Sequence, residues 1–265
     1  MQTTILDFTG VYEAQPFMQE LRGRADTRYI GCGDIPGTDC YCDDEAVETI
    51  RKRIAEVGIT DASGIHFFDN GNYHYMSKIW TDMIQEPFSL VVFDHHPDMQ
   101  EPRFGNILSC GGWVKKVVEE NPFVDNVVII GVADHLADEF RNDKVTFIRE
   151  SELPSVTVDS IAALRLQNDN KSRAQKDIPL YISIDKDALS TDYAATNWDQ
   201  GSLSLEHTKA IIDALARNHK IIGVDICGER ARDFAGDAQH SVQEADALND
   251  RTNRELAGFL ASILP

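Results

Sequence analysis

Residues 90–98 read LVVFDHHPD, four apolar residues followed by a cluster of acidic and histidine side chains. An unbroken apolar run bounded by polar sequence predicts a strand that is buried on both faces, as in a parallel sheet. Alternate side chains of an extended chain point to the same side. Asp94, His96 and Asp98 are therefore expected to converge at the end of this strand, whereas His95 is expected to point away.

Strand-like and helix-like segments alternate along the rest of the chain. Strands are predicted at 3–7, 64–68, 88–94, 126–131, 145–148, 179–185 and 221–226. Helices are predicted at 17–22, 43–57, 73–83, 113–120, 158–166, 205–218 and 251–263, and residues 31–43 (GCGDIPGTDCYCD) are predicted to form an ordered loop. This alternation favours an α/β fold, a three-layer sandwich with a mainly parallel sheet flanked by helices. Without a linker or repeat, residues 1–265 are expected to form a single domain.

The composition excludes several classes of function. Among 265 residues, 44 are acidic and 25 are basic, which gives a formal charge of −19. A general nucleic-acid-binding protein would need a basic face instead. No apolar run is long enough for a membrane span, and the N-terminus lacks the features of a signal peptide, so we expect a cytoplasmic protein.

The number and spacing of the cysteines indicate reduced thiols. There are five, at positions 32, 40, 42, 110 and 227. Cys40 and Cys42 are too close for ordinary zinc-finger spacing and have no second pair, which leaves a zinc site as the minor alternative. Reduced thiols agree with a cytosolic location.

Two further motifs follow strands as the first one does. GNYH (71–74) comes after the predicted strand at 64–68, and SIDKD (183–187) includes the end of the strand at 179–185. Ligands bind beyond the carboxyl ends of the strands in such sheets. The two carboxylates and one imidazole of the first motif, converging at such an edge, indicate a metal site, because unpaired carboxylates rarely cluster at low dielectric. A solvated charged turn is the alternative for the D-x-H-x-D motif alone.

Together these motifs resemble the arginase (ureohydrolase) family, which includes agmatinases and formimidoylglutamases, over about residues 60–229. The resemblance implies an arginase-like fold with two manganese ions per chain and six ligands. It implies that two aspartates bridge the ions while two His–Asp pairs complete the ions separately. The bridging residues are Asp94 and Asp185, and the pairs are His74 with Asp98 and His96 with Asp187.

The implied activity is hydrolysis of a C–N bond. Two cations about 3.5–4 Å apart can lower the pKa of a shared water and present hydroxide as a nucleophile. The substrate implied is a small-molecule or peptidyl guanidino or amidino compound, from which a ureohydrolase releases urea. The resemblance is also consistent with a homo-oligomer.

The chain departs from the family at three points. The family's proton-shuttling His-Gly pair is replaced by Cys110-Gly111, where the thiol could transfer a proton or simply pack. The family's guanidinium-binding Glu lies three residues after an Asp, whereas Glu229 lies four residues after Asp225. We expect Glu229 to reach the substrate's cationic group through a bulge, and Asp187 or Cys110 to manage the proton. Residues 99–102 (MQEP) differ from the small polar groups that arginases use to recognise free arginine.

Two other functions remain as alternatives. One is a deacetylase-like amidohydrolase on the same fold, with a single zinc, and the other is a non-catalytic metal-binding protein that lacks the shuttle histidine. Outside the ligand set, His66 is expected to be a core histidine. Asp134 and His135 are expected near the edge of the site, where they could support it.

Overall fold

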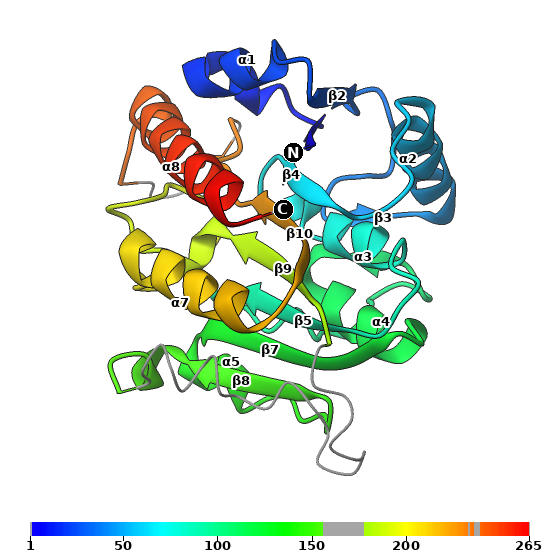
Figure 1. Cartoon of the computed structure of the whole chain (residues 1–265), viewed down its shortest axis with the longest axis vertical. Coiled ribbons are helices and arrows are strands. Elements are labelled where there is room, and N and C mark those ends of the chain that lie inside the picture. Colours follow the sequence, from blue (N-terminus) through cyan, green and yellow to red (C-terminus); the bar gives the residue numbers. More distant parts are fainter. Residues whose placement is uncertain (1, 156–177, 233, 236–238, 265) are drawn as a thin grey trace.

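The computed structural model describes residues 2–155, 178–232, 234–235 and 239–264, and it is built on an eight-stranded sheet (Figure 1). The strand order is β2-β1-β4-β10-β9-β5-β7-β8, and every neighbouring pair is parallel. The strands are β1 Thr3–Asp7, β2 Thr27–Gly31, β4 Gly64–Phe68, β5 Phe88–Phe93, β7 Val124–Val132, β8 Val145–Arg149, β9 Leu180–Asp185 and β10 Ile221–Cys227. The predicted fold class is confirmed.

The alternation of side chains along β5 explains why this strand lies inside the sheet. All six of its residues are buried. Leu90 and Val92 belong to the apolar core on one face of the sheet, and Val91 and Phe93 belong to the core on the other. A strand with both faces apolar is stable only where helices cover both sides.

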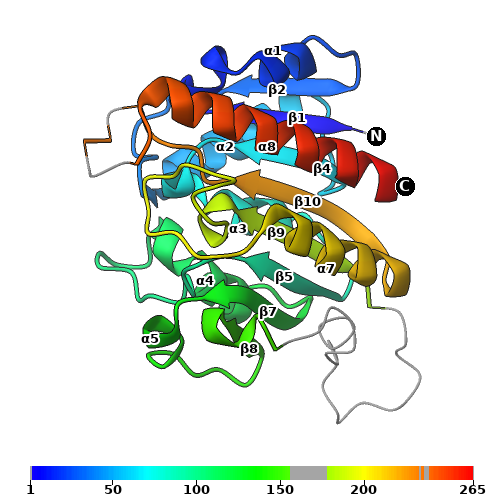
Figure 2. The same ribbon diagram turned by 90° about the vertical axis from the view of Figure 1, so that its left-hand side faces the viewer.

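Helices cover the two faces of the sheet separately (Figure 2). Buried residues of α2 (Asp44–Glu56), α3 (Met76–Thr81) and α4 (Trp113–Glu120) pack into the first core. Buried residues of α1 (Pro16–Arg22), α7 (Leu205–Asn218) and α8 (Val242–Ile263) pack into the second. The remaining helical turns are short: α5 Asp134–Ala137, η1 Val11–Ala14, η2 Gly71–Tyr73, η3 Cys110–Gly112, η4 Glu150–Glu152 and η5 Lys186–Ala188.

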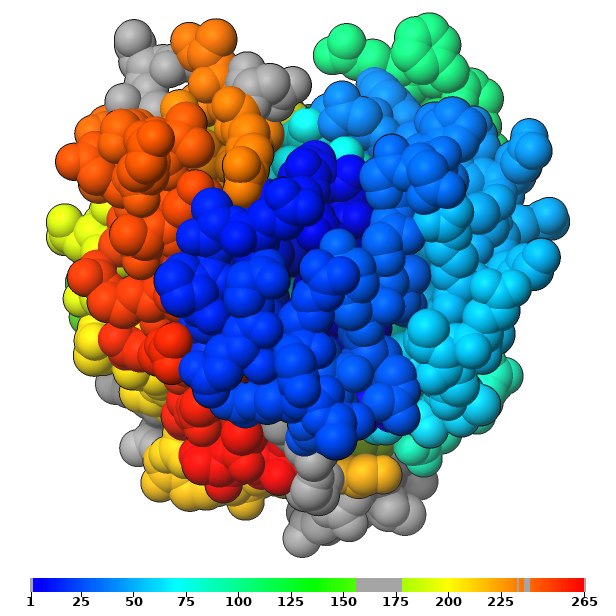
Figure 3. All heavy atoms as spheres, turned by 90° about the horizontal axis from the view of Figure 1, so that it is seen from above, coloured from blue at the N-terminus to red at the C-terminus, as the bar shows by residue number. Residues whose placement is uncertain are grey.

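The N-terminal segment covers the sheet at the β2 end. Figure 3 shows this segment (blue) lying between the C-terminal helix (red) and the segment that follows β2. α1, near the N-terminus, packs here against α8, the C-terminal helix.

A second, small sheet lies beside the main one. β3 (Tyr41–Cys42) pairs antiparallel with β6 (Leu108–Ser109). The predicted loop at 31–43 therefore contributes a short strand that ties it to the segment before α4.

Some elements differ from the sequence prediction. β2 was not predicted. The helix predicted at 73–83 is shorter, α3 at 76–81, and η2 precedes it. α8 begins nine residues before the expected position 251. The helix predicted at 158–166 lies outside the described residues. Within the described part of the chain, every helix is too short or too polar to cross a membrane.

Candidate metal centre

The site lies where the central strands end. The main-chain turns after β4, β5 and β9 bring all six predicted ligand side chains to one edge of the sheet, and five of the six are buried. These residues are His74, Asp94, His96, Asp98, Asp185 and Asp187. Parallel strands place their carboxyl ends together, which is why residues more than 110 positions apart in the sequence become neighbours.

His74 is the centre of the first group. Its Nδ1 atom lies 3.1 Å from Asp98 Oδ2, 3.2 Å from Asp94 Oδ2 and 3.3 Å from Asp185 Oδ2. The other ring nitrogen, Nε2, lies 2.9 Å from Ser183 Oγ. A partner on the second nitrogen fixes the orientation of the ring, as is usual for histidines that bind metals.

His96 and Asp187 form the second group with Asp94. His96 Nδ1 lies 2.9 Å from Asp187 Oδ2 and 3.5 Å from Asp94 Oδ1. The other oxygen of Asp187 accepts a hydrogen bond of 3.1 Å from the backbone N–H of His95. The imidazole of His95 is turned toward the carbonyl of Gly131, with 3.3 Å between Nδ1 and O. His95 is thus held by the backbone of β7, but it also belongs to the residues that line the pocket, so it is not fully turned away from the site as expected.

Asp94 links the two groups. One oxygen faces His96, and it accepts a 2.6 Å hydrogen bond from the backbone N–H of that residue. The other oxygen, Oδ2, is buried, lies near His74 and accepts no hydrogen bond from any described residue. A buried carboxylate oxygen without a donor is costly, because it has lost its water without replacing it.

Several supporting residues were not foreseen. The indole Nε1 of Trp113 donates a 2.6 Å hydrogen bond to Asp98 Oδ2, and Asp98 itself has φ = 47°, a left-handed conformation. Behind His74, the hydroxyl of Ser77 lies 3.1 Å from Ser183 Oγ and donates to Asp225 Oδ1. Ser183 belongs to the quoted SIDKD motif, but Ser77 and Trp113 carry no local signal in the sequence.

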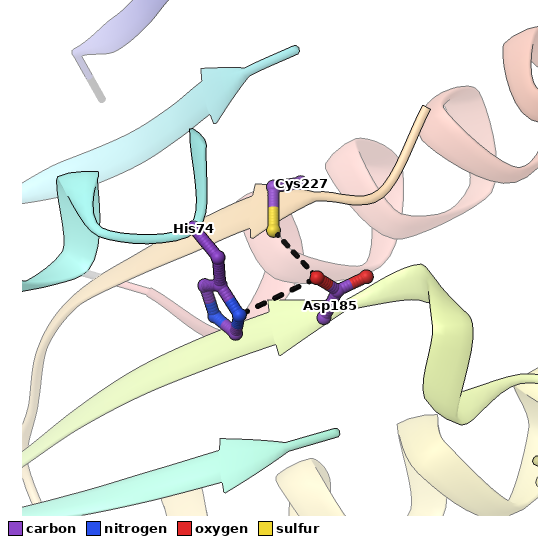
Figure 4. A group of neighbouring side chains, drawn as sticks. All are labelled: His74, Asp185 and Cys227. Atoms are coloured by element: carbon purple, nitrogen blue, oxygen red, sulfur yellow. Dashed lines mark hydrogen bonds and ion pairs between the residues drawn. The ribbon is translucent and has the colours of Figure 1, made fainter. Parts of the chain in front are cut away.

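Cys227 is a further neighbour of the first group. Its thiol lies at the end of β10 and contacts Asp185 Oδ2, the oxygen that also lies near His74 Nδ1, at 3.2 Å (Figure 4). Asp185 Oδ1 accepts a 3.0 Å hydrogen bond from the backbone N–H of Asp187. Burial, followed by the charge of Asp185, raises the pKa of the Cys227 thiol well above its usual value. The thiol form therefore donates to Asp185 and supports its orientation.

The site holds more negative charge than its own residues can balance. Four buried or nearly buried carboxylates face two imidazoles. Burial and the charge of Asp94 raise the pKa of Asp98 to about 6. Burial favours the neutral imidazole of His96, but Asp187 and Asp94 outweigh it and raise its pKa to about 12. Each shift moves a proton toward a site that lacks positive charge.

These residues fit divalent cations. Carboxylate oxygens and imidazole nitrogens are suitable ligands, and the atoms of each group lie within 4.8 Å of one another. Bound cations would supply the missing positive charge and a partner for Asp94 Oδ2. The set with His74, Asp94 and Asp98 and the set with Asp94, His96 and Asp187 share one residue, which is the arrangement expected for two neighbouring ions.

Glu229 is placed differently from the other predicted residues. It is 1% exposed and pairs with the ammonium group of Lys186, which is also fully buried. Gln15 Nε2 and Asn253 Nδ2 donate further hydrogen bonds to the same carboxylate, at 2.7 and 2.8 Å. Glu229 is not among the residues described as lining the pocket above the site. Its charge is already neutralised from within the protein.

Gly228 occupies the position at which the family's Glu is expected. Its φ is +90°, and a Cβ atom there would lie 2.3 Å from Asp185 Oδ1 and 2.7 Å from the backbone nitrogen of Lys186. A side chain at this position would therefore displace Asp185. The bulge that was expected to bring Glu229 into the pocket is absent from the register of β10 at residues 223–227.

A pocket of about 500 Å³ opens above the two groups. Cys110 lines it beside the ligands, whereas Asp134 is turned away and bonded to Ser151. The indole of Trp198, 41% exposed, lies edge-on to the His96 ring at 5.7 Å between centroids. Among the described residues, the pocket is also lined by one arginine and by several other ionisable or aromatic side chains. These lining residues, called the rim below, are Tyr41, Glu101, Arg103, His135, Glu139, Phe140 and Asp199.

Residues 12–229 match the family model described as Arginase family. The chain belongs to the arginase family. It is also 30% identical over 226 residues to an uncharacterised protein of Thermotoga maritima, a match that covers 85% of this chain and 78% of the other.

Solved structures of the arginase fold agree with this assignment. The proclavaminate amidino hydrolase of Streptomyces clavuligerus is similar with a TM-score of 0.67 and 17% identity, covering 98% of this chain and 91% of that one. The formimidoylglutamase of Bacillus subtilis gives 0.65 and 11%, covering 100% and 88%. The arginase of Bacillus caldovelox gives 0.61 and 13%, covering 97% and 98%. At these identities the similarity establishes the fold alone.

Proposed function

We propose that this member of the arginase family is a manganese-dependent hydrolase that cleaves a C–N bond of an amidino or guanidino compound, with release of urea from a guanidine. The observation that carries the proposal is the pair of His–Asp groups that share Asp94, whose buried Oδ2 has no hydrogen-bond donor among the described residues. Two manganese ions would fit this arrangement.

The six ligands would divide between the ions as follows. Asp94 and Asp185 would bridge them, His74 and Asp98 would complete one, and His96 and Asp187 would complete the other. When bound, the ions would supply electrophilic activation of water and offset the charge of the carboxylates.

The remaining residues of the site would handle the proton and the substrate. Asp187 and Cys110 both line the pocket, and either can carry a proton to the departing amine. Glu229 would not hold the cationic group, because Lys186 already occupies its carboxylate. This role would fall to the acidic rim and to the exposed face of Trp198, since a planar cation stacks favourably on an indole.

Metal analysis combined with a turnover assay tests the proposal. Protein produced with added Mn²⁺ would be analysed for metals and then incubated with a panel of guanidines, including agmatine-like amines and peptides with an internal arginine, while urea is measured. About two manganese ions per chain with urea release is the expected result. Two manganese ions without turnover of any compound would identify a non-catalytic metal-binding member. A single zinc would favour a deacetylase-like enzyme.

A further inference from the structure

Two cysteines face each other across the small antiparallel ribbon at the mouth of the pocket. In this ribbon Tyr41 pairs with Ser109 and Cys42 pairs with Leu108. Cys40 and Cys110 are the next residues beyond these pairs, and the backbone N–H of Cys110 donates a 2.9 Å hydrogen bond to the carbonyl of Cys40. Cys40 has left the strand conformation, with φ = 58°, but this hydrogen bond keeps the two backbones in contact. Hydrogen-bonded antiparallel neighbours have Cα atoms about 5.5 Å apart, which lies within the range that a disulfide spans.

The two side chains are close enough to change each other's acidity. The Cys110 thiol lowers the pKa of Cys40, and the Cys40 thiol, followed by burial, raises the pKa of Cys110. The Cys40 thiol also donates a hydrogen bond of 3.9 Å to Asp39 Oδ1. Cys40 is partly exposed, Cys110 is buried, and both line the pocket.

The other three cysteines are in different surroundings. Cys32 and Cys42 are buried, and burial raises the pKa of each to about 12. Cys227 is buried against Asp185. A thiol reacts as its thiolate, so an accessible cysteine with a lowered pKa and a second thiol beside it is the arrangement found in redox-sensitive pairs.

We propose that Cys40 and Cys110 are a reversible disulfide-forming pair at the entrance of the metal site. With a low-molecular-weight disulfide such as glutathione disulfide as oxidant, the thiolate of Cys40 attacks one sulfur and releases one glutathione thiolate. Cys110 then attacks the Cys40 sulfur of the mixed disulfide and releases the second. The two cysteines lose two electrons and two protons, and the oxidant becomes two molecules of glutathione.

The disulfide would have two consequences for the pocket. It would join residues 31–43 covalently to the turn that begins α4, and it would remove the S–H of Cys110 from the pocket wall. Loss of activity on oxidation rests on the function proposed above, because it requires Cys110 to carry a proton. Formation of the disulfide does not depend on that function.

Thiol counting and peptide mapping test the disulfide directly. The purified full-length protein would be incubated with glutathione disulfide in the presence of a chelator, denatured, alkylated and digested for mass spectrometry. Two of the five thiols should disappear, a peptide linking Cys40 to Cys110 should appear, and dithiothreitol should restore both thiols. Retention of all five thiols, or a link that involves Cys32 or Cys42, would overturn the proposal.

Variants separate the two steps of the reaction. Cys110→Ser should stop at a mixed disulfide between Cys40 and glutathione, and Cys40→Ser should leave Cys110 unmodified. Cys42→Ser is the matched control, two residues from Cys40, and should form the same disulfide as the wild type. Urea release would be measured in parallel, so that a disulfide without any activity in the reduced protein would refute the proposed function and not the disulfide.

Discussion

The buried pair between Lys186 and Glu229 allows a direct test of whether Glu229 is a structural residue. We consider Lys186→Met, which removes the ammonium group and leaves the carboxylate in place. Breaking a buried ion pair costs about 3–5 kcal/mol, because the remaining charge loses its partner. Gln15 and Asn253 would still donate hydrogen bonds to the carboxylate, so we expect the lower end of this range, about 3 kcal/mol.

The reverse substitution should cost more. In Glu229→Gln the ammonium of Lys186 stays buried, with Asn253 Oδ1 as a charge-neutral acceptor at 3.1 Å. We expect a loss of about 4–5 kcal/mol. The double variant should recover most of either loss, because no unpaired charge remains.

Thermal and urea unfolding of the metal-free proteins, followed by tryptophan fluorescence, would measure these effects. A loss of about 3 kcal/mol corresponds to a decrease in Tm of roughly 6–12 °C for a chain of this size. The matched control is Lys209→Met, which breaks the exposed pair between Lys209 and Glu255 and should cost less than about 1 kcal/mol. A Glu229→Gln protein as stable as the wild type would refute the structural role, since that is the behaviour of a carboxylate kept free for a ligand.

Three further predictions concern the metals, the substrate and the core. Asp94→Asn should lower bound manganese from about two ions per chain to less than one, as measured by metal analysis; unchanged metal content would exclude Asp94 as a shared ligand. Trp198→Ala should raise KM for a cationic substrate by about tenfold with little change in kcat, whereas Trp198→Phe should keep most of the binding; equal effects of both would argue against stacking. Burial lowers the pKa of His66 to about 4 in the folded protein, so the unfolded chain, near 6.5, takes up this proton first as the pH falls. The contribution of neutral His66 to the free energy of unfolding is therefore complete above pH 6.5. It is lost as the pH falls toward 4, by about 3 kcal/mol in total. His66→Leu should remove this part of the pH dependence in urea unfolding, and an unchanged profile would contradict it.

The sequence predicted the central strands of the sheet because they are buried on both faces. Segments such as 88–94 and 126–131 are almost wholly apolar, and β5 and β7 are found there. The two edge strands, β2 and β8, have mixed burial, which weakens the apolar signal of an edge strand. Of these two, β8 was predicted and β2 was not. A sequence signal does mark the start of α8. It is a capping box, in which the side chains of Ser241 and Glu244 accept hydrogen bonds from each other's backbone N–H groups. The prediction relied instead on apolar periodicity, which begins later in this helix.

The convergence of the six candidate ligands was predictable, because it follows from strand ends in a parallel sheet. The burial of Glu229 and its pairing with Lys186 were not predictable. Its partners are Lys186, at the next strand end, and Gln15 and Asn253, which lie more than 230 residues apart in the sequence. No local pattern indicates that a lysine between two aspartates turns away from them and into the protein. His66 was correctly expected in the core, where its ring stacks on Trp80 with 3.7 Å between centroids.

Gly228 limits how this branch of the family can change its specificity. Any other residue there must adopt φ near +90° and push aside Asp185, which is one of the six candidate ligands. A glutamate cannot be restored at this position by one substitution without disturbing the centre itself. New specificity is therefore more accessible through the rim, where Glu139, Trp198 and Asp199 can vary independently of the ligands. Changes in what the pocket binds are therefore better sought at its entrance than at its floor.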